Sequence, residues 1–222
     1  MPHSDRDSPE ASGFLAYVTS MLPAPAARVL EIGCGAEGGV TPALSAAGYD
    51  AVGIDPNAPE GPLFRRTTIE AFDDPGPFDA VVAGRVLHHV EPLDKAMAKL
   101  ARLAPLLLVD EFACDRIDDA ARDWYGSEIR RRASPPPRAP QDLDEWRWAH
   151  PGLHPYDVVR RALDRCYQER DFRWEPYLYR WLGGEETKAR EEAMIAADAL
   201  QPIGFRYTGV RLDAQPREPG SR

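Results

Sequence analysis

Two acidic residues flank a short run of glycines near the start of the chain, and their spacing suits a nucleoside-like cofactor. Gly33 and Gly35 follow Glu31 at the end of an apolar stretch, and Asp55 ends a second apolar stretch. Glycine lets the chain turn sharply and lets a ligand approach bare backbone. An acid about 20 residues beyond such glycines suits the hydroxyls of a ribose. Glu31 argues against a pyrophosphate, because its charge would compete with the phosphates for helix N–H groups, so we expect a cationic ligand.

A second group of reactive side chains follows later apolar runs. His88 and His89 come directly after one run, and Glu111 stands at the end of another. Histidine has an ordinary pKa close to neutrality, so it suits a general base that removes a proton from a hydroxyl or phenol. Glu111 is the acid that could orient such a ring. Asp110 is less suitable, because adjacent side chains on a strand point to opposite faces.

Together these motifs resemble the class I S-adenosylmethionine-dependent methyltransferases. The resemblance covers roughly residues 10–112 and includes the glycine loop, Asp55, and the segments 68–72, 78–90 and 106–111. It implies S-adenosyl-L-methionine, a sulfonium cation, as the cofactor and S-adenosyl-L-homocysteine as the product. The cofactor contacts that it implies are Glu31, Gly33, Cys34, Gly35, Asp55, Pro56, Ile69, Glu70 and Gly84.

The resemblance also implies roles for the histidine pair. In small-molecule members of the family with a similar pair, the first histidine tends to face the substrate and the second is buried. We therefore predict that His88 is the base or orients the acceptor, that Glu111 holds its ring, and that His89 is structural. Packing or capping is the alternative role for His88.

Apolar runs that alternate with helical patterns predict an α/β fold. Continuously apolar runs indicate parallel strands covered on both faces, and the resemblance implies a doubly wound, mostly parallel seven-stranded sheet of the Rossmann-like methyltransferase type. Its last strand, residues 204–212, is antiparallel in the related family. A helix over 185–200 and a strand over 172–178 precede it.

About sixty residues separate the fifth strand from the sixth, which is more than a crossover needs. We predict that residues 113–171 form a helical lid, because an insertion at that point hangs over the carboxyl ends of the strands, where open sheets bind ligands. The alternative is that its aromatic rings only attach the insertion to the sheet. The predicted substrate contacts are Trp124, Tyr125, His154 and Tyr177.

Length and composition indicate one domain over 1–222, with residues 1–8 and 213–222 disordered. A net charge of −9 argues against binding to nucleic acid or to an anionic membrane. Three scattered cysteines and the absence of a signal peptide favour the cytoplasm. We expect the protein to be a monomer or a homodimer. No metal site is expected, because proline and glycine keep His150 and His154 off a shared helical face.

A small-molecule acceptor fits these features best. Residues 84–88 carry Gly-Arg-Val-Leu-His where family members that methylate DNA bases or protein glutamine carry Asn/Asp-Pro-Pro-Tyr. O-, N- and C-methylation are all compatible with the sequence. Two other functions remain open: a protein that binds the cofactor but senses it or catalyses another reaction, and an NAD-dependent oxidoreductase.

Overall fold

A seven-stranded sheet forms the centre of the computed structural model, which describes residues 9–74, 76–134, 136–137 and 139–212. The strand order is β3-β2-β1-β4-β5-β7-β6, and every neighbouring pair is parallel except those of β7. This confirms the predicted doubly wound, Rossmann-like sheet with its antiparallel last strand. The segments 1–8 and 213–222, which we expected to be disordered, lie outside the described residues. The strands are β1 (Arg28–Ile32), β2 (Asp50–Ile54), β3 (Phe64–Arg65), β4 (Ala80–Gly84), β5 (Leu106–Phe112), β6 (Tyr167–Glu175) and β7 (Gly204–Arg211).

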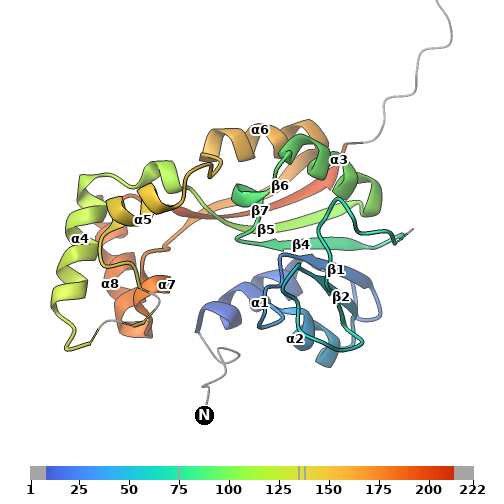
Figure 1. Cartoon of the computed structure of the whole chain (residues 1–222), viewed down its shortest axis with the longest axis horizontal. Helices are drawn as coiled ribbons and strands as arrows, with labels where there is room; N and C mark the ends of the chain where they lie inside the picture. Colours follow the sequence, from blue (N-terminus) through green and yellow to red (C-terminus); the bar gives the residue numbers. More distant parts are fainter. Residues whose placement is uncertain (1–8, 75, 135, 138, 213–222) are drawn as a thin grey trace, which may run out of the picture.

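Helices cover both faces of this sheet (Figure 1). Helices α1 (Pro9–Met21) and α2 (Thr41–Ala46) lie on one face, and α3 (Leu93–Leu103) and α6 (Tyr156–Cys166) lie on the other. Neighbouring strand residues divide between the two faces: Val29 belongs to the apolar cluster of α1 and α2, and Leu30 to that of α3 and α6. The strands are therefore apolar at successive positions because both of their faces are covered.

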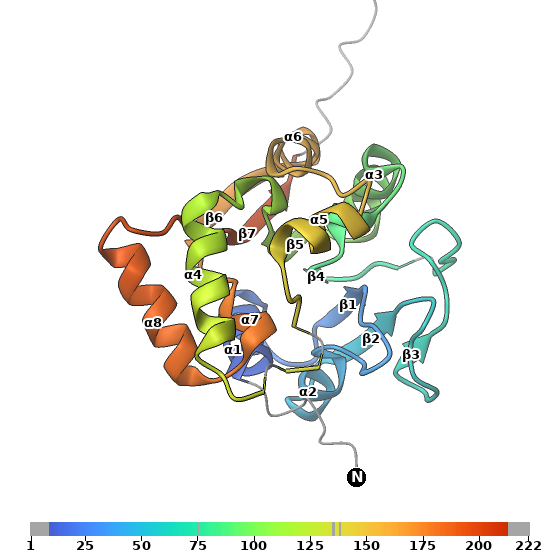
Figure 2. The same cartoon turned by 60° about the vertical axis from the view of Figure 1, so that its left-hand side comes forward.

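The remaining helices gather beyond one end of the sheet, as Figures 1 and 2 show. They are α4 (Asp119–Arg130), α5 (Leu143–Ala149), α7 (Tyr179–Leu182) and α8 (Glu185–Ala196), and we call them the helical cap. Two short 3-10 turns, η2 (Leu87–His89) and η3 (Cys114–Arg116), follow β4 and β5. The cap has an apolar core of its own, which includes Phe112 at the end of β5.

The cap differs in two ways from the predicted insertion over 113–171. Helix α6 returns to the sheet and packs against α3, because its apolar face of Val159, Ala162 and Leu163 is buried there. Strand β6 starts at Tyr167, five positions earlier than the predicted Phe172. The cap segment of this connection is therefore 113–155 rather than 113–171.

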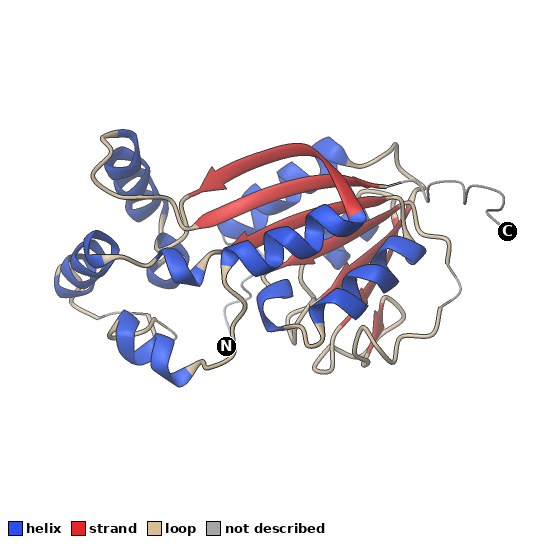
Figure 3. Ribbon diagram, turned by 90° about the horizontal axis from the view of Figure 1, so that it is seen from above, coloured by secondary structure: helices blue, strands red, loops and turns tan. Residues whose placement is uncertain are grey.

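The helix predicted over 185–200 is α8, and the structure places it in the cap and not against the sheet (Figure 2); Figure 3 shows the group of helices beyond one end of the sheet. The only buried residues of α8 are Thr187 and Glu191, so it has no apolar stripe to lay on a sheet. It is tied to α4 through Arg190, which donates to the buried Glu128 at 2.7 and 3.0 Å. Two connections, one after β5 and one after β6, thus build the cap.

No helix in the described part of the chain is long and apolar enough to cross a membrane.

Candidate functional site

The carboxyl ends of the parallel strands bring the predicted site residues to one edge of the sheet. Glu31 lies in β1, Asp55 directly follows β2, and Glu111 is the penultimate residue of β5. His88 lies in η2, the turn after β4. Since β1, β2, β4 and β5 are parallel neighbours, residues that end them share this edge.

Glu31 holds the start of α2 instead of exposing its carboxylate. One oxygen accepts from the Val40 N–H at 3.0 Å, and the other accepts from the N–H of Thr41 at 2.7 Å and its hydroxyl at 2.6 Å. Glu31 is only 4% exposed, and burial raises its pKa against the opposing effect of these hydrogen bonds. The expectation that its charge meets the cofactor directly is therefore corrected: the carboxylate fixes the loop and neutralises the helix N-terminus.

The two glycines of the loop are needed for different reasons. Both have positive φ, +72° at Gly33 and +62° at Gly35. A Cβ at Gly33 would lie 2.6 Å from the side chain of Val86, whereas a Cβ at Gly35 would meet no atom within 4 Å. Only Gly35 therefore borders open space that a ligand can fill, and Gly33 is required by the protein itself.

Asp55 and its neighbours lie where a ribose contact is expected. The Asp55 side chain is partly exposed and accepts from the Asn57 N–H at 2.7 Å, which sets the turn after β2. Pro56 is exposed in the same turn. Ile69 and Glu70 lie in the turn after β3; the side chain of Ile69 is buried in the core, and Glu70 is exposed.

Cys34 and Gly84 are packing residues in this structure. The Cys34 thiol lies under the loop, 3.2 Å from where a Cβ of Gly53 would be, and burial raises its pKa to about 12. A Cβ at Gly84 would lie 3.1 Å from the ring of Phe14 in α1. Any contact of these two residues with a cofactor would therefore come from their backbone.

The predicted pairing of His88 with Glu111 is confirmed. His88 Nδ1 lies 2.6 Å from a Glu111 oxygen, and the N–H groups of Leu87 and Phe112 donate to the same carboxylate at 2.6 and 2.9 Å. Glu111 is fully buried, and three donors fix its orientation. A carboxylate held in this way keeps the proton of a neutral imidazole on Nδ1 and leaves Nε2 as the basic nitrogen.

The exposure of the two histidines is the reverse of the prediction. The His88 side chain is 6% exposed, whereas His89 is exposed. The rings lie 4.2 Å apart between centroids. The prediction rested on the related family; in this chain both rings belong to a 3-10 turn, and the bond to the buried Glu111 holds the His88 ring inside while His89 stays outside.

Three consecutive residues at the end of β5 contact three different parts of the molecule. Asp110 points away from His88, as predicted, and binds the guanidinium groups of Arg180 in α7 and Arg206 in β7. Burial disfavours its charge, but the two arginines outweigh burial and hold its pKa below the usual range. Glu111 binds His88, and the Phe112 ring stacks on Tyr177 at 4.3 Å. This short run attaches the cap to the same strand that positions His88.

The predicted substrate contacts are mostly interior residues of the cap. Trp124 and Tyr125 are buried in its core, and the Tyr125 hydroxyl donates to the Pro140 carbonyl at 2.9 Å. They are not available to an acceptor, which is a correction: they pack within the cap itself, with the Tyr125 ring against Trp181 of α7. Tyr177 is also buried, which raises its pKa to about 12, and the nearby negative charge of Glu111 acts in the same direction.

His154 ties the cap segment to the turn that carries the histidine pair. Its backbone N–H donates to the His88 carbonyl at 2.9 Å, and its Nε2 lies 2.9 Å from the Val90 carbonyl and 3.1 Å from Glu91. Both of these partners are acceptors, so Nε2 carries a proton. His154 therefore has a structural contact in place of the predicted substrate contact.

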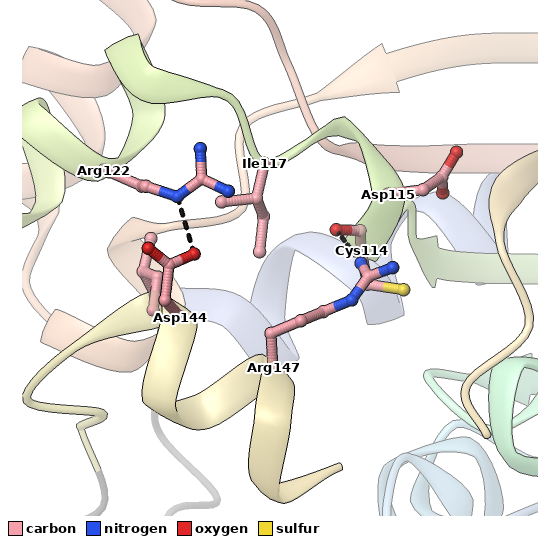
Figure 4. Close-up of a pocket in the computed structure, with 7 residues that line it drawn as sticks. Cys114, Asp115, Ile117, Arg122, Asp144 and Arg147 are labelled. Atoms are coloured by element: carbon pink, nitrogen blue, oxygen red, sulfur yellow. Dashed lines mark hydrogen bonds and ion pairs between the residues drawn. The ribbon is translucent and has the colours of Figure 1, made fainter. Parts of the chain in front are cut away.

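A hollow of about 270 Å³ opens between η3, α4 and α5 (Figure 4). Its walls are charged: Arg122 binds Asp144 at 2.8 Å, and Arg147 donates to the Cys114 carbonyl at 2.5 Å. None of the predicted substrate contacts lines it.

Among the described residues, no group of three or more His, Cys, Asp or Glu side chains could hold a metal ion.

Sequence reasoning missed two residues near the site. Arg85 directly follows β4 with a φ of +55°, and its charge acts on Glu31, Asp110 and Tyr177. Trp146 in α5 packs against Phe112 at 5.6 Å. The position of Arg85 directly after a strand could have identified it, whereas nothing local distinguishes Trp146 from the other rings of the insertion.

Comparison with known proteins identifies the domain. A family model described as a methyltransferase domain matches residues 10–176. No curated protein matches the chain.

Several solved structures share the fold at low sequence identity. An S-adenosylmethionine-dependent methyltransferase from Mesorhizobium loti is 16% identical with a TM-score of 0.58, covering 91% of this chain and 100% of its own. Magnesium protoporphyrin IX methyltransferase from Synechocystis PCC 6803, with bound S-adenosylhomocysteine, is 17% identical with a TM-score of 0.55, covering 91% and 82%. The 1,6-didemethyltoxoflavin-N1-methyltransferase from Burkholderia thailandensis, with bound 1,6-didemethyltoxoflavin and S-adenosylhomocysteine, is 15% identical with a TM-score of 0.57, covering 93% and 80%.

Proposed function

The chain belongs to the methyltransferase-domain family, and on that premise we propose that it methylates a small-molecule metabolite beside the helical cap. The protein is an enzyme, an S-adenosylmethionine-dependent methyltransferase of class I, and S-adenosyl-L-methionine is its cofactor. The proposal concerns the acceptor and the residues that serve it.

The observation that carries this reading is the Glu31 carboxylate on the N-terminus of α2. The first free N–H groups of that helix donate to Glu31, and the N–H groups of Gly33 and Cys34 donate to the Ile54 carbonyl. A dinucleotide needs such N–H groups for its pyrophosphate. These four N–H groups are therefore not available to a phosphate, which disfavours the oxidoreductase alternative, whereas the open space at Gly35 and the carboxylate of Asp55 fit a phosphate-free adenosyl sulfonium.

When bound, S-adenosyl-L-methionine supplies an electrophilic methyl group. The residues of this chain then have three tasks. Asp55 binds the ribose hydroxyls, with Pro56, Ile69 and Glu70 beside it, and the backbone of the glycine loop and of Gly84 borders the rest of the cofactor. The histidine pair after β4 receives a proton from the acceptor, while Glu111 holds the Nδ1 proton of His88. The cap keeps water from the acceptor, and alignment in a dry site supplies most of the rate.

Three features support a small-molecule acceptor. The net charge of −9 disfavours binding to nucleic acid or to an anionic membrane. The protoporphyrin and toxoflavin enzymes that share the fold are named for small ring-shaped compounds. Residues 84–88 also lack the Asn/Asp-Pro-Pro-Tyr turn of family members that methylate DNA bases or protein glutamine. We propose a single-domain enzyme, monomeric or homodimeric, in which the cap forms the acceptor side.

The test is to incubate the protein with methyl-labelled S-adenosylmethionine and a metabolite extract separated into fractions. We expect label in one small-molecule fraction, and none in the same reaction run with a Gly35→Val variant that remains folded. Label in nucleic acid or protein would refute the small-molecule acceptor. Binding of S-adenosylhomocysteine without any transfer would instead favour the sensor or non-methylating alternative.

A further inference from the structure

The two histidines after β4 differ in what surrounds them. His88 is enclosed: Glu111 binds its Nδ1, the Phe112 ring lies nearly perpendicular to it with the centroids 6.0 Å apart, and its backbone carbonyl accepts from the His154 N–H. With its side chain 6% exposed, it has little surface left for an acceptor. A group in this position can orient and polarise a neighbour better than it can touch a substrate.

His89 is the exposed member and lies next to both parts of the site. Its ring is tilted by 41° against the ring of His88, with the centroids 4.2 Å apart, and its N–H donates to the carbonyl of Val86, the residue that packs on Gly33 of the cofactor loop. His150, which follows α5 and stacks on Trp146 at 4.6 Å, is close enough for its charge to act on His89. His89 therefore lies in the same short turn as Val86, which packs on the cofactor loop, and within electrostatic range of His150 at the end of α5.

We propose that His89 is the residue that contacts the methyl acceptor and takes its proton, and that His88 and Glu111 are positioning residues behind it. This inference rests on the proposed function. The step forms a bond between the acceptor atom and the methyl carbon and breaks the bond of that carbon to sulfur. The proton that the acceptor loses passes to the His89 ring, and the sulfonium becomes a neutral thioether.

The groups around His89 favour its neutral, basic form. Partial desolvation, together with the electrostatic effect of the neighbouring His88 and His150 rings, lowers the pKa of His89 from its ordinary value, and the Glu111 carboxylate opposes this only in part. Because the neutral ring is the active form of a base, the rate should stay high down to below pH 6.5 and fall as the pH drops through the lowered pKa.

The experiment measures methyl transfer into the labelled metabolite fraction for wild type, His89→Gln, His88→Gln and His150→Gln between pH 5 and 9. For His89→Gln we expect kcat to fall by about 10²- to 10⁴-fold, the acid limb to disappear, and the Tm and the affinity for S-adenosylhomocysteine to stay at wild-type values. His150→Gln should keep the limb but move it to higher pH, because one cause of the lowered pKa is gone. His88→Gln should lower the Tm and still retain an acid limb.

Two results would overturn the inference without touching the proposed function. One is a wild-type rate and pH profile in His89→Gln, and the other is an acid limb lost in His88→Gln but kept in His89→Gln. Failure of the proposed function would look different: the wild-type protein itself would label no metabolite fraction, whether or not it binds S-adenosylhomocysteine.

Discussion

At the residue scale, neighbours in sequence have unlike roles because they face different environments. In β5, Asp110 meets two arginines on one side of the sheet and Glu111 meets a histidine on the other. In the glycine loop, Gly33 faces Val86 and Gly35 faces open space. Single substitutions at these positions therefore separate binding from folding.

Asp55 offers the first such separation. Replacing Asp55 with alanine should weaken S-adenosylhomocysteine binding by roughly ten- to a hundredfold or more, because hydrogen bonds to a charged acceptor contribute about 1.5–3 kcal/mol each. Titration calorimetry measures the change. Asp55→Asn is the matched control, since it keeps an oxygen for the Asn57 N–H but loses the charge. Its affinity for S-adenosylhomocysteine should lie between those of wild type and Asp55→Ala. Equal affinity in all three proteins would exclude Asp55 as the ribose ligand.

Gly33 and Gly35 form a second matched pair. Alanine at either position costs about 1–2 kcal/mol for a left-handed backbone. Gly33→Ala must also displace Val86 and should lower the Tm further, whereas Gly35→Ala should mainly reduce cofactor affinity. Thermal unfolding and calorimetry on both variants check this. The assignment of the ligand space to Gly35 fails if Gly35→Ala binds S-adenosylhomocysteine as tightly as wild type.

At the element scale, two short helices each have a buried carboxylate that accepts hydrogen bonds from the N–H groups at the helix N-terminus. Glu31 does this for α2, and Glu191 does it for α7, where it accepts from Tyr177 at 2.7 Å, Leu178 at 3.0 Å and Tyr179 at 2.7 Å. Helices this short do not satisfy their own termini, so a distant acid supplies the acceptor. Glu191 also sets the backbone from which the Tyr177 ring stacks on Phe112.

The role of Glu191 predicts a local loss of stability in the cap. Glu191→Ala leaves three buried N–H groups without an acceptor, at about 1–3 kcal/mol each, so the Tm should fall by about 6 °C or more. Glu191→Gln keeps one acceptor oxygen and should show a smaller loss. The affinity for S-adenosylhomocysteine should change little in either variant, because the cofactor loop lies at β1 and β2 and not in the cap. A Tm unchanged by Glu191→Ala would contradict the proposed support of α7.

At the scale of the whole molecule, the sheet and the cap have separate cores that meet at the end of β5. The sheet core holds the cofactor edge, and the cap core contains Phe112 together with side chains from α4, α5 and α7. Ion pairs across the cap join elements that are far apart in sequence, such as Glu128 in α4 and Arg190 in α8. Because the cap is attached to the sheet at the end of β5, we expect a ligand that binds at this edge of the sheet to stabilise the whole protein against unfolding.

This arrangement predicts a selective thermal shift. At a concentration of about 100 times its Kd, S-adenosylhomocysteine should stabilise the protein by about 2.7 kcal/mol and raise the Tm by roughly 5–10 °C. NAD at the same concentration should give no shift, since Glu31 already holds the helix N–H groups that a pyrophosphate would need. Differential scanning calorimetry makes the comparison. A shift with NAD and none with S-adenosylhomocysteine would reverse the assignment of the cofactor.

The sequence alone determined the alternation of strands with helices, the glycine turn after the first strand, the position of Asp55 after the second and the pairing of His88 with Glu111. These follow from local patterns, because an apolar run predicts a strand and parallel strands bring their carboxyl ends together. Only the tertiary structure decided that His89 is exposed, that Trp124 and Tyr125 face the cap core, and that α8 leaves the sheet for α4. A turn has no fixed alternation of faces, and an aromatic ring or a charged helix can pack against any suitable surface. The choice among those surfaces depends on contacts between segments distant in sequence, which no local pattern contains.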